Sequence, residues 1–193
     1  MAKLVVVLGS VTPPGRLHRA VNGGIETVRT SFPRWEVELL DLANYRIGFA
    51  DGRPLEQFED DTQAVVGSIV SADAVVLTSP VYRASYTGAL KNLLDLTPLE
   101  GLSGKACGII AMGATAHHYL GVDGPLRAVL AWFGALVTPN SVYLTSADFV
   151  DGQPSETALH DVRELMRSVL TLQIQLRGLS HPLGPAPLAA RHG

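Results

Sequence analysis

The sequence predicts a doubly wound α/β fold, in which helices cover both faces of a five-stranded parallel sheet. Five short apolar segments, most of them rich in β-branched residues, have the composition of buried parallel strands. Segments with helical periodicity alternate with them, and right-handed crossovers then give three α/β/α layers with strand order 2-1-3-4-5. The strands are expected at residues 4–8, 35–40, 74–77, 106–112 and 135–144. The helices are expected at residues 16–31, 55–71, 86–97, 126–133 and 155–176.

Length and composition indicate a single domain with a large apolar core. The chain has 193 residues, of which 47% are hydrophobic and 17% are charged, and its net charge is −3. This balance predicts no binding to nucleic acid or to a membrane, and no apolar stretch approaches the ~20 residues of a membrane span. The first residues lack the architecture of a secretion signal, so we expect a cytoplasmic protein. We assign the domain to residues 1–178 and a Pro-, Ala- and Gly-rich tail to residues 179–193.

Residues that commonly bind metal ions do not cluster in this sequence. Cys107 is the only cysteine, which excludes an intramolecular disulfide and a cysteine-rich metal site, and its apolar neighbours predict a buried thiol. His117 and His118 are adjacent, and adjacent side chains rarely point to one metal ion. We therefore expect these histidines to be ordinary polar loop residues or to contact a cofactor.

The first strand leads into a loop that is suited to bind a phosphate. The apolar run 4–8 ends in Gly9 and Ser10, and a helix is expected to begin near Arg16 after a loop with two prolines. A helix N-terminus presents backbone N–H groups and the positive end of the helix dipole to an anion. The loop is neither a G-x-G-x-x-G fingerprint nor a P-loop, and it could also be a solvated loop with a surface arginine. Further phosphate contacts are expected from Ser10, Thr12, Arg16 or His18.

The second strand is expected at the edge of the sheet, because residues 35–40 alternate between apolar and polar side chains. An irregular segment, residues 41–54, follows it. A connection of this length usually has a function or forms an interface. The second helix is expected directly after this segment, at residues 55–71.

The third strand and the helix after it form the centre of the prediction. Pro80 ends the apolar run 74–77 and turns the chain outward at the carboxyl end of the strand. Helical periodicity begins at Tyr86, so residues 80–85 form a loop at the edge where open α/β sheets bind ligands.

The fourth strand ends at the same edge, in Gly113-Ala114-Thr115. The loops after the first, third and fourth strands should therefore meet in one crevice.

Farther along the chain, Pro125 is expected to begin a helix, because proline fits the first helical turn but not a helix interior. Pro139-Asn140 interrupts the last strand, and Ser155 is expected to cap the last helix.

Residues of the third loop and its helix also resemble a known family. The segment Ser79-Pro80-Val81-Tyr82, followed by Leu90-Lys91 and Leu94-Asp95, is similar to the signature of the NAD(P)H-dependent FMN reductases, which have a flavodoxin-like fold. In the first loop Gly9, Ser10 and Arg16 match the family, while Gly15, Leu17 and His18 replace its hydroxyl residues. In the fourth loop Gly113 and Thr115 match a Gly-Gly-Thr-like segment, Ala114 replaces a glycine, and His118 lies where some members have a histidine.

This resemblance implies that FMN binds with its phosphate near Arg16 and its isoalloxazine over the Pro80–Arg83 loop. NADPH or NADH would deliver the hydride, and Arg83 would attract the phosphates of the dinucleotide. No side chain is expected to act as acid, base or nucleophile, because the cofactor carries the chemistry. The expected flavin-binding residues are Ser10, Thr12, Arg16, Leu17, His18, Pro80, Val81, Tyr82, Arg83, Gly113, Ala114, Thr115 and His118.

The resemblance also implies partners. Such reductases supply reduced FMN to flavin-dependent monooxygenases of the alkanesulfonate type, and a homodimer or homotetramer is expected. Some members that release FMN carry an extra residue that bulges the helix after the fourth loop. Here Pro125 either predicts an unbulged helix and a retained flavin, or simply begins the helix with no bearing on flavin exchange. Three alternatives stay open: a reductase of quinones, azo dyes or metal oxyanions with fixed FMN, a flavodoxin-type electron carrier, and an interaction module without flavin. The net charge of −3 argues against the carrier, since flavodoxins are strongly acidic.

Overall fold

A computed structural model describes residues 1–179 and 183–185. The parallel sheet has the strand order β2-β1-β3-β4-β5, as predicted, and β6 also pairs with β4. Its strands are β1 (Ala2–Leu8), β2 (Trp35–Asp41), β3 (Ala74–Pro80), β4 (Ala106–Met112), β5 (Leu136–Val137) and β6 (Val142–Leu144). The α-helices of the described residues are α1 (Arg16–Ser31), α2 (Thr62–Ser71), α3 (Gly88–Leu96), α4 (Leu120–Phe133) and α5 (Glu156–Arg177). A separate hairpin consists of β7 (Phe149–Val150) and β8 (Gln153–Pro154).

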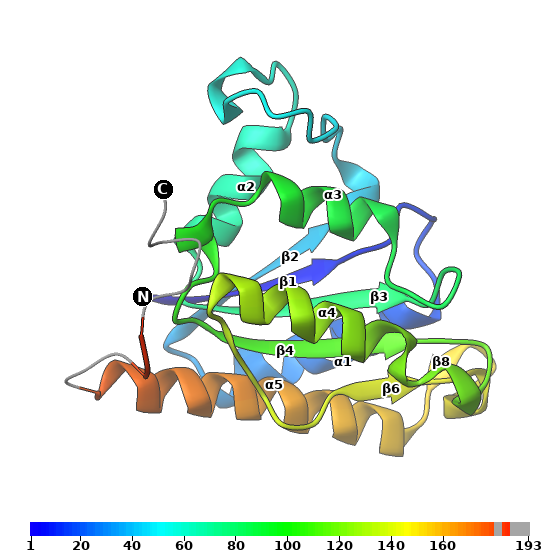
Figure 1. The fold of residues 1–193 in the computed structure, drawn as a ribbon. Coiled ribbons are helices and arrows are strands. Elements are labelled where there is room, and N and C mark those ends of the chain that lie inside the picture. Colours follow the sequence, from blue (N-terminus) through cyan, green and yellow to red (C-terminus); the bar gives the residue numbers. More distant parts are fainter. Residues whose placement is uncertain (180–182, 186–193) are drawn as a thin grey trace.

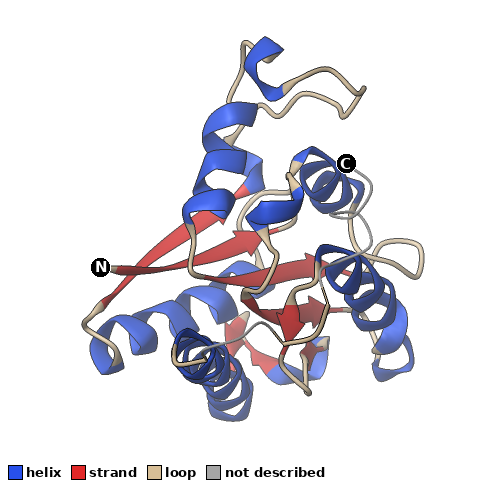
Figure 2. Ribbon diagram, turned by 60° about the vertical axis from the view of Figure 1, so that its left-hand side comes forward, coloured by secondary structure: helices blue, strands red, loops and turns tan. Residues whose placement is uncertain are grey.

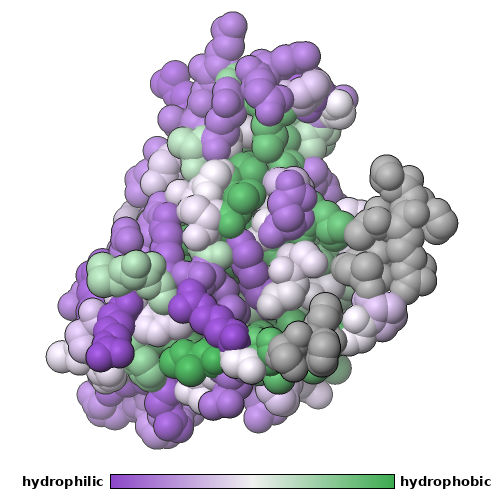
Figure 3. All heavy atoms as spheres, turned by 90° about the vertical axis from the view of Figure 1, so that its left-hand side faces the viewer, coloured by the Kyte–Doolittle hydropathy of each residue, from purple (hydrophilic) through white to green (hydrophobic). Residues whose placement is uncertain are grey.

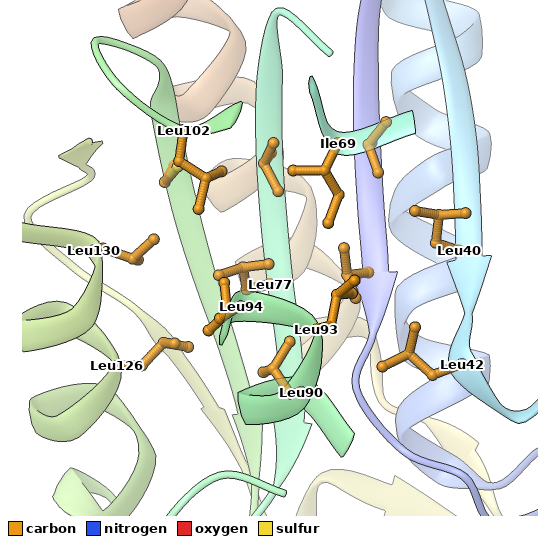
Figure 4. Close-up of a cluster of buried hydrophobic side chains, with 14 of the residues drawn as sticks. Leu40, Leu42, Ile69, Leu77, Leu90, Leu93, Leu94, Leu102, Leu126 and Leu130 are labelled. Carbon is orange, nitrogen blue, oxygen red and sulfur yellow. The ribbon is translucent and has the colours of Figure 1, made fainter. Parts of the chain in front are cut away.

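The helices form two layers around the sheet. Helices α2, α3 and α4 cover one face of the sheet, and α1 and α5 cover the other. In Figure 1, α2 and α3 lie above the strands, α4 passes in front of β3 and β4, and α5 lies below them. Figure 2 shows the same three layers after rotation. Two buried clusters fill the spaces between the layers, and the leucines of α3 and α4 pack onto β3 and β4 in one of them (Figure 4). The fold is therefore the predicted doubly wound α/β/α arrangement.

The last strand is interrupted where the sequence predicts. β5 and β6 both pair with β4, and Pro139 and Asn140 lie between them. Proline has no N–H for a ladder hydrogen bond, so the strand splits into two short pieces. Ser155 caps α5 as predicted, since its hydroxyl accepts the Ala158 N–H at 3.2 Å.

The predicted helix at residues 55–71 is wrong in its first half. Only Leu55–Gln57 forms a 3₁₀ turn, and α2 begins at Thr62. The Asp60 carboxylate accepts the Thr62 N–H at 2.9 Å, while Asp61 accepts the Arg46 N–H at 2.7 Å. These local hydrogen bonds stop a helix from continuing through this acidic stretch and tie it back to the preceding loop.

Two further helix starts differ from the prediction. Helix α3 begins at Gly88 instead of Tyr86, because the Thr87 hydroxyl accepts the Leu90 N–H and caps the helix. Helix α4 begins at Leu120, so Pro125 lies inside it and does not begin it. The buried Val122 explains the earlier start of α4, since a later start would remove this side chain from the core.

The C-terminal tail predicted at 179–193 lies largely outside the described residues, and the domain boundary stays a prediction. Among the described residues, no helix combines the length and apolar character that crossing a membrane requires.

Figure 3 views the face at the amino ends of the strands, where polar residues cover most of the segment that projects at the top. The candidate site lies at the opposite edge.

Candidate functional site

The loops at the carboxyl ends of β1 and β3 line one cavity of about 170 Å³. Seven of the predicted flavin-binding residues contribute to its wall, together with Leu8, three further loop residues and Met112 at the end of β4. The seven are Ser10, Thr12, Arg16, Leu17, His18, Pro80 and Tyr82. The fold thus brings together predicted residues that are up to 72 positions apart in the sequence, from Ser10 to Tyr82.

The N-terminus of α1 opens toward this cavity. Gly15 is the N-cap residue, and it provides no side-chain hydrogen bond to the helix. The first turn also lacks an acidic residue that would neutralise the helix dipole. Its N–H groups and the guanidinium of Arg16, the first helical residue, are therefore available to an anion. This arrangement fits a phosphate group.

Two hydroxyl groups line the same cavity as this helix N-terminus. Ser10 Oγ and Thr12 Oγ1 share a hydrogen bond of 2.7 Å, and Ser10 Oγ also accepts the Thr12 N–H at 3.3 Å. Gly9 precedes them, and a Cβ at this position would lie 2.5 Å from the Thr78 carbonyl oxygen. Only glycine therefore lets the loop leave β1 so close to β3.

Thr87 connects this loop to β3 and α3. Its buried hydroxyl donates a hydrogen bond to the Gly9 carbonyl and accepts the Leu90 N–H at 3.1 Å. Its backbone N–H donates to Ser79 Oγ at 3.0 Å. The loops after β1 and β3 are consequently held in a fixed relation before any ligand binds.

The loop after β3 forms a tight turn with Arg83 at its tip. Tyr82 and Ser85 exchange two backbone hydrogen bonds of 2.8 and 3.0 Å. Arg83 and Ala84 between them have φ values of 50° and 63°, which are unfavourable for residues other than glycine. The turn places the Arg83 side chain in solvent beside the half-exposed Tyr82.

The loop after β4 lies next to the first part of this turn. The Val81 N–H donates to the Met112 carbonyl at 2.8 Å, so Val81 and Gly113 are neighbours. A Cβ on Gly113 would collide with the Tyr143 hydroxyl, which donates to the Thr115 carbonyl at 2.7 Å. Partial burial raises the pKa of Tyr143, which keeps its hydroxyl protonated as a donor.

Part of the predicted set lies outside the cavity wall. Val81, Arg83, Gly113, Ala114, Thr115 and His118 are in the adjoining loops, where Ala114, Thr115 and His118 are exposed. His18 lies in the wall, with its Nε2 atom 3.9 Å from Oδ2 of the buried Asp41 and a ring nitrogen 3.1 Å from Asn22. The set therefore divides into residues that line the cavity and residues of the adjoining loops.

The sequence reasoning did not single out Thr87, Met112 or Phe149, which lie at or beside the site. The guanidinium carbon of Arg16 lies 5.8 Å from the centroid of the Phe149 ring. Asp151-Gly152 is a typical hairpin turn sequence and could have predicted the hairpin that carries Phe149.

A larger hollow of about 490 Å³ lies between β6 and α5, and none of the predicted residues lines it.

Comparison with known proteins identifies the family of this chain. The family model for NADPH-dependent FMN reductases matches residues 2–149. An NAD(P)H-dependent FAD/FMN reductase of Geobacillus thermodenitrificans is 38% identical over 132 residues, which cover 68% of this chain and 70% of that protein. The NADH-dependent FMN reductase SfnF of Pseudomonas putida is 31% identical over 147 residues, which cover 76% of this chain and 79% of that protein.

The fold is also found among solved structures. An oxidoreductase from Corynebacterium diphtheriae superimposes with a TM-score of 0.74 at 21% identity, over 91% of this chain and 98% of that one. At this identity the likeness shows the shared fold alone. The family match, which spans most of the sheet and all three site loops, decides the identity: the chain belongs to the family of NADPH-dependent FMN reductases.

Proposed function

We propose that this NAD(P)H-dependent FMN reductase binds FMN with its phosphate at the N-terminus of α1 and its ring beside Pro80 and Tyr82. The observation that carries the proposal is the uncapped first turn of α1, which shares one cavity with Arg16 and with the hydroxyls of Ser10 and Thr12. An uncapped helix end, a cation and hydroxyl donors are the groups that bind a phosphate. These residues fit FMN.

The protein's part in the reaction is to bind and orient. Bound FMN supplies the redox chemistry, since its isoalloxazine takes up the hydride from the nicotinamide. Pro80 and Met112 give the cavity apolar walls, and Thr87 holds the loops after β1 and β3 together. The exposed Arg83 at the tip of its turn attracts the phosphates of the dinucleotide. No proton transfer by a side chain is required of this site.

A comparison of FMN with riboflavin tests the phosphate site. Replacement of Arg16 by alanine (R16A) should weaken FMN binding by about 1.5–3 kcal/mol, the range of a charge-assisted hydrogen bond. Riboflavin lacks the phosphate, so its dissociation constant should stay unchanged. Arg167→Ala is the matched control, since Arg167 is an exposed arginine on α5 whose ion pair with Glu164 is remote from the cavity. Equal losses for the two flavins in R16A would remove Arg16 from the site.

We further propose that FMN stays bound between turnovers. Helix α4 is α-helical from Leu120 to Phe133, without the bulge that the family resemblance implies for some members that release FMN. The protein should then remain yellow after desalting and give parallel lines in a kinetic matrix of NADPH against an acceptor. Colourless protein with intersecting lines for NADPH and FMN would show that FMN is a substrate instead. Free FMN, a quinone and an azo dye as alternative acceptors separate a flavin reductase from a reductase with fixed FMN.

Association into a homodimer or homotetramer is also a proposal. The exposed apolar side chains that support it lie on α4 and on the segment that leads to α2. Leu120 is 55% exposed, Trp132 57% and Phe49 77%. Light scattering at micromolar concentration tests the assembly, and a fully active monomer would refute it. Delivery of reduced flavin to a monooxygenase in the cytoplasm stays a prediction, which a coupled assay with such an enzyme would test.

A further inference from the structure

The hairpin β7–β8 lies at the same edge of the sheet as the candidate phosphate site. Asp151 and Gly152 form its turn with φ values of 50° and 76°, which match a two-residue hairpin turn. In Figure 1 the hairpin lies at the right-hand end of the molecule, where the strands of the parallel sheet end. The family model ends at residue 149, so the hairpin turn lies beyond the matched region.

Hydrogen bonds hold this hairpin against the neighbouring elements on both sides. Arg19 on α1 donates from Nε to the Gly152 carbonyl at 2.5 Å. At the base of the hairpin, the Ser155 N–H donates to the Asp148 carbonyl at 2.8 Å, and Asp148 also closes a capping box with Thr145. The hairpin is therefore fixed to the first turns of α1 and to the start of α5.

This attachment places the Phe149 ring beside Arg16. The guanidinium carbon of Arg16 lies over the ring at 5.8 Å from its centroid, within the range of a cation–π interaction. Phe149 itself is partly buried against the core below the sheet, so its ring has a fixed position. Among the described residues Arg16 has no ion pair, and a cation–π contact leaves its N–H donors available.

We propose that Phe149 is a positioning residue for the phosphate of FMN. It holds the Arg16 guanidinium at the cavity through the cation–π contact, and it thereby contributes to the preference for FMN over riboflavin. An unrestrained arginine side chain loses rotamer entropy when it binds an anion, and prior restraint by the ring reduces that loss. The inference rests on the proposed binding of FMN phosphate by Arg16.

The test measures dissociation constants for FMN and riboflavin by flavin fluorescence in four proteins: wild type, Phe149→Leu, Phe149→Tyr and Arg16→Ala. Phe149→Leu keeps an apolar side chain but removes the ring. It should weaken FMN binding by about two- to five-fold, the range for an exposed cation–π contact, and leave the affinity for riboflavin unchanged. Phe149→Tyr keeps the ring and should bind FMN like the wild type. Thermal unfolding of each variant checks that the fold is retained.

A double variant, Phe149→Leu with Arg16→Ala, decides whether Phe149 acts through the arginine. We expect Phe149→Leu to have no further effect on FMN binding once Arg16 is absent. Three results would overturn the inference. Phe149→Leu could weaken the binding of FMN and riboflavin equally, it could leave the dissociation constant for FMN unchanged, or its effect could be additive with that of Arg16→Ala in the double variant. If Arg16→Ala weakens FMN selectively while Phe149→Leu does not, only the role of Phe149 fails. If Arg16→Ala has no selective effect, the proposed phosphate site fails with it.

Discussion

Removal of the Thr87 hydroxyl should disturb both the stability of the fold and the affinity for FMN. Thr87 is only 3% exposed, and its hydroxyl joins the Gly9 carbonyl to the N-terminus of α3. Replacement by valine keeps the shape of the side chain but removes both hydrogen bonds. The Leu90 N–H and the Gly9 carbonyl then lose this partner in the protein interior.

The expected loss of stability in Thr87→Val follows from these two backbone groups, the Leu90 N–H and the Gly9 carbonyl. Loss of a threonine N-cap costs about 0.5–2 kcal/mol, and a buried polar group without a partner costs about 1–3 kcal/mol. We therefore expect Thr87→Val to lower the free energy of unfolding by about 2–4 kcal/mol. FMN affinity should fall as well, because the Gly9 carbonyl anchors the loop that presents Ser10 and Thr12.

Urea denaturation followed by circular dichroism measures the change in stability, and flavin fluorescence measures the affinity. Thr87→Ser is the matched control, because serine keeps the hydroxyl and loses only a methyl group, at a cost of about 1 kcal/mol. A Thr87→Val protein that unfolds within about 0.5 kcal/mol of Thr87→Ser would refute the assigned hydrogen bonds.

Three further predictions concern other parts of the chain. Pro125→Ala restores an interior helical N–H in α4 and should raise the free energy of unfolding by about 1–3 kcal/mol, measurable as a higher thermal midpoint. Burial raises the pKa of Asp73, but the Lys3 backbone N–H and the Arg177 guanidinium outweigh it and hold this pKa below its ordinary 3.8. Asp73 therefore stabilises the fold above pH 3.8, and this contribution is lost as the pH falls through its folded pKa; Asp73→Asn should destabilise at pH 7 and have little effect in the most acidic buffers. Burial raises the pKa of the Cys107 thiol to about 12, so a maleimide should label it at pH 8 only after unfolding.

Most of the sheet could be predicted from the sequence because the central strands are buried on both faces. Such strands have continuous apolar runs, as in Val5-Val6-Val7 and Val75-Val76-Leu77, and alternation marks the edge strand that begins at Trp35. Helix ends were less predictable. The position of Pro125 favours a helix start by local preference, but burial of Val122 extends α4 through it.

The loops that form the site could be predicted from the rule that ligands bind at the carboxyl ends of parallel strands. The contacts that hold these loops could not, because they join residues far apart in the sequence. Thr87 donates to the carbonyl of Gly9, 78 positions away, and Arg19 donates to Gly152, 133 positions away. No local sequence pattern predicts a contact between residues so far apart.

The sequence by itself determined the layer order, the strand order and the position of the loop that leads from β1 to Arg16. These properties depend on hydrophobic periodicity and on short-range backbone preferences, which act between residues that are close along the chain. Only the tertiary structure decided that Phe149 lies beside Arg16 and that Gly113 makes room for the Tyr143 hydroxyl. Both contacts arise where separate elements pack together, and packing depends on the three-dimensional arrangement of all of them.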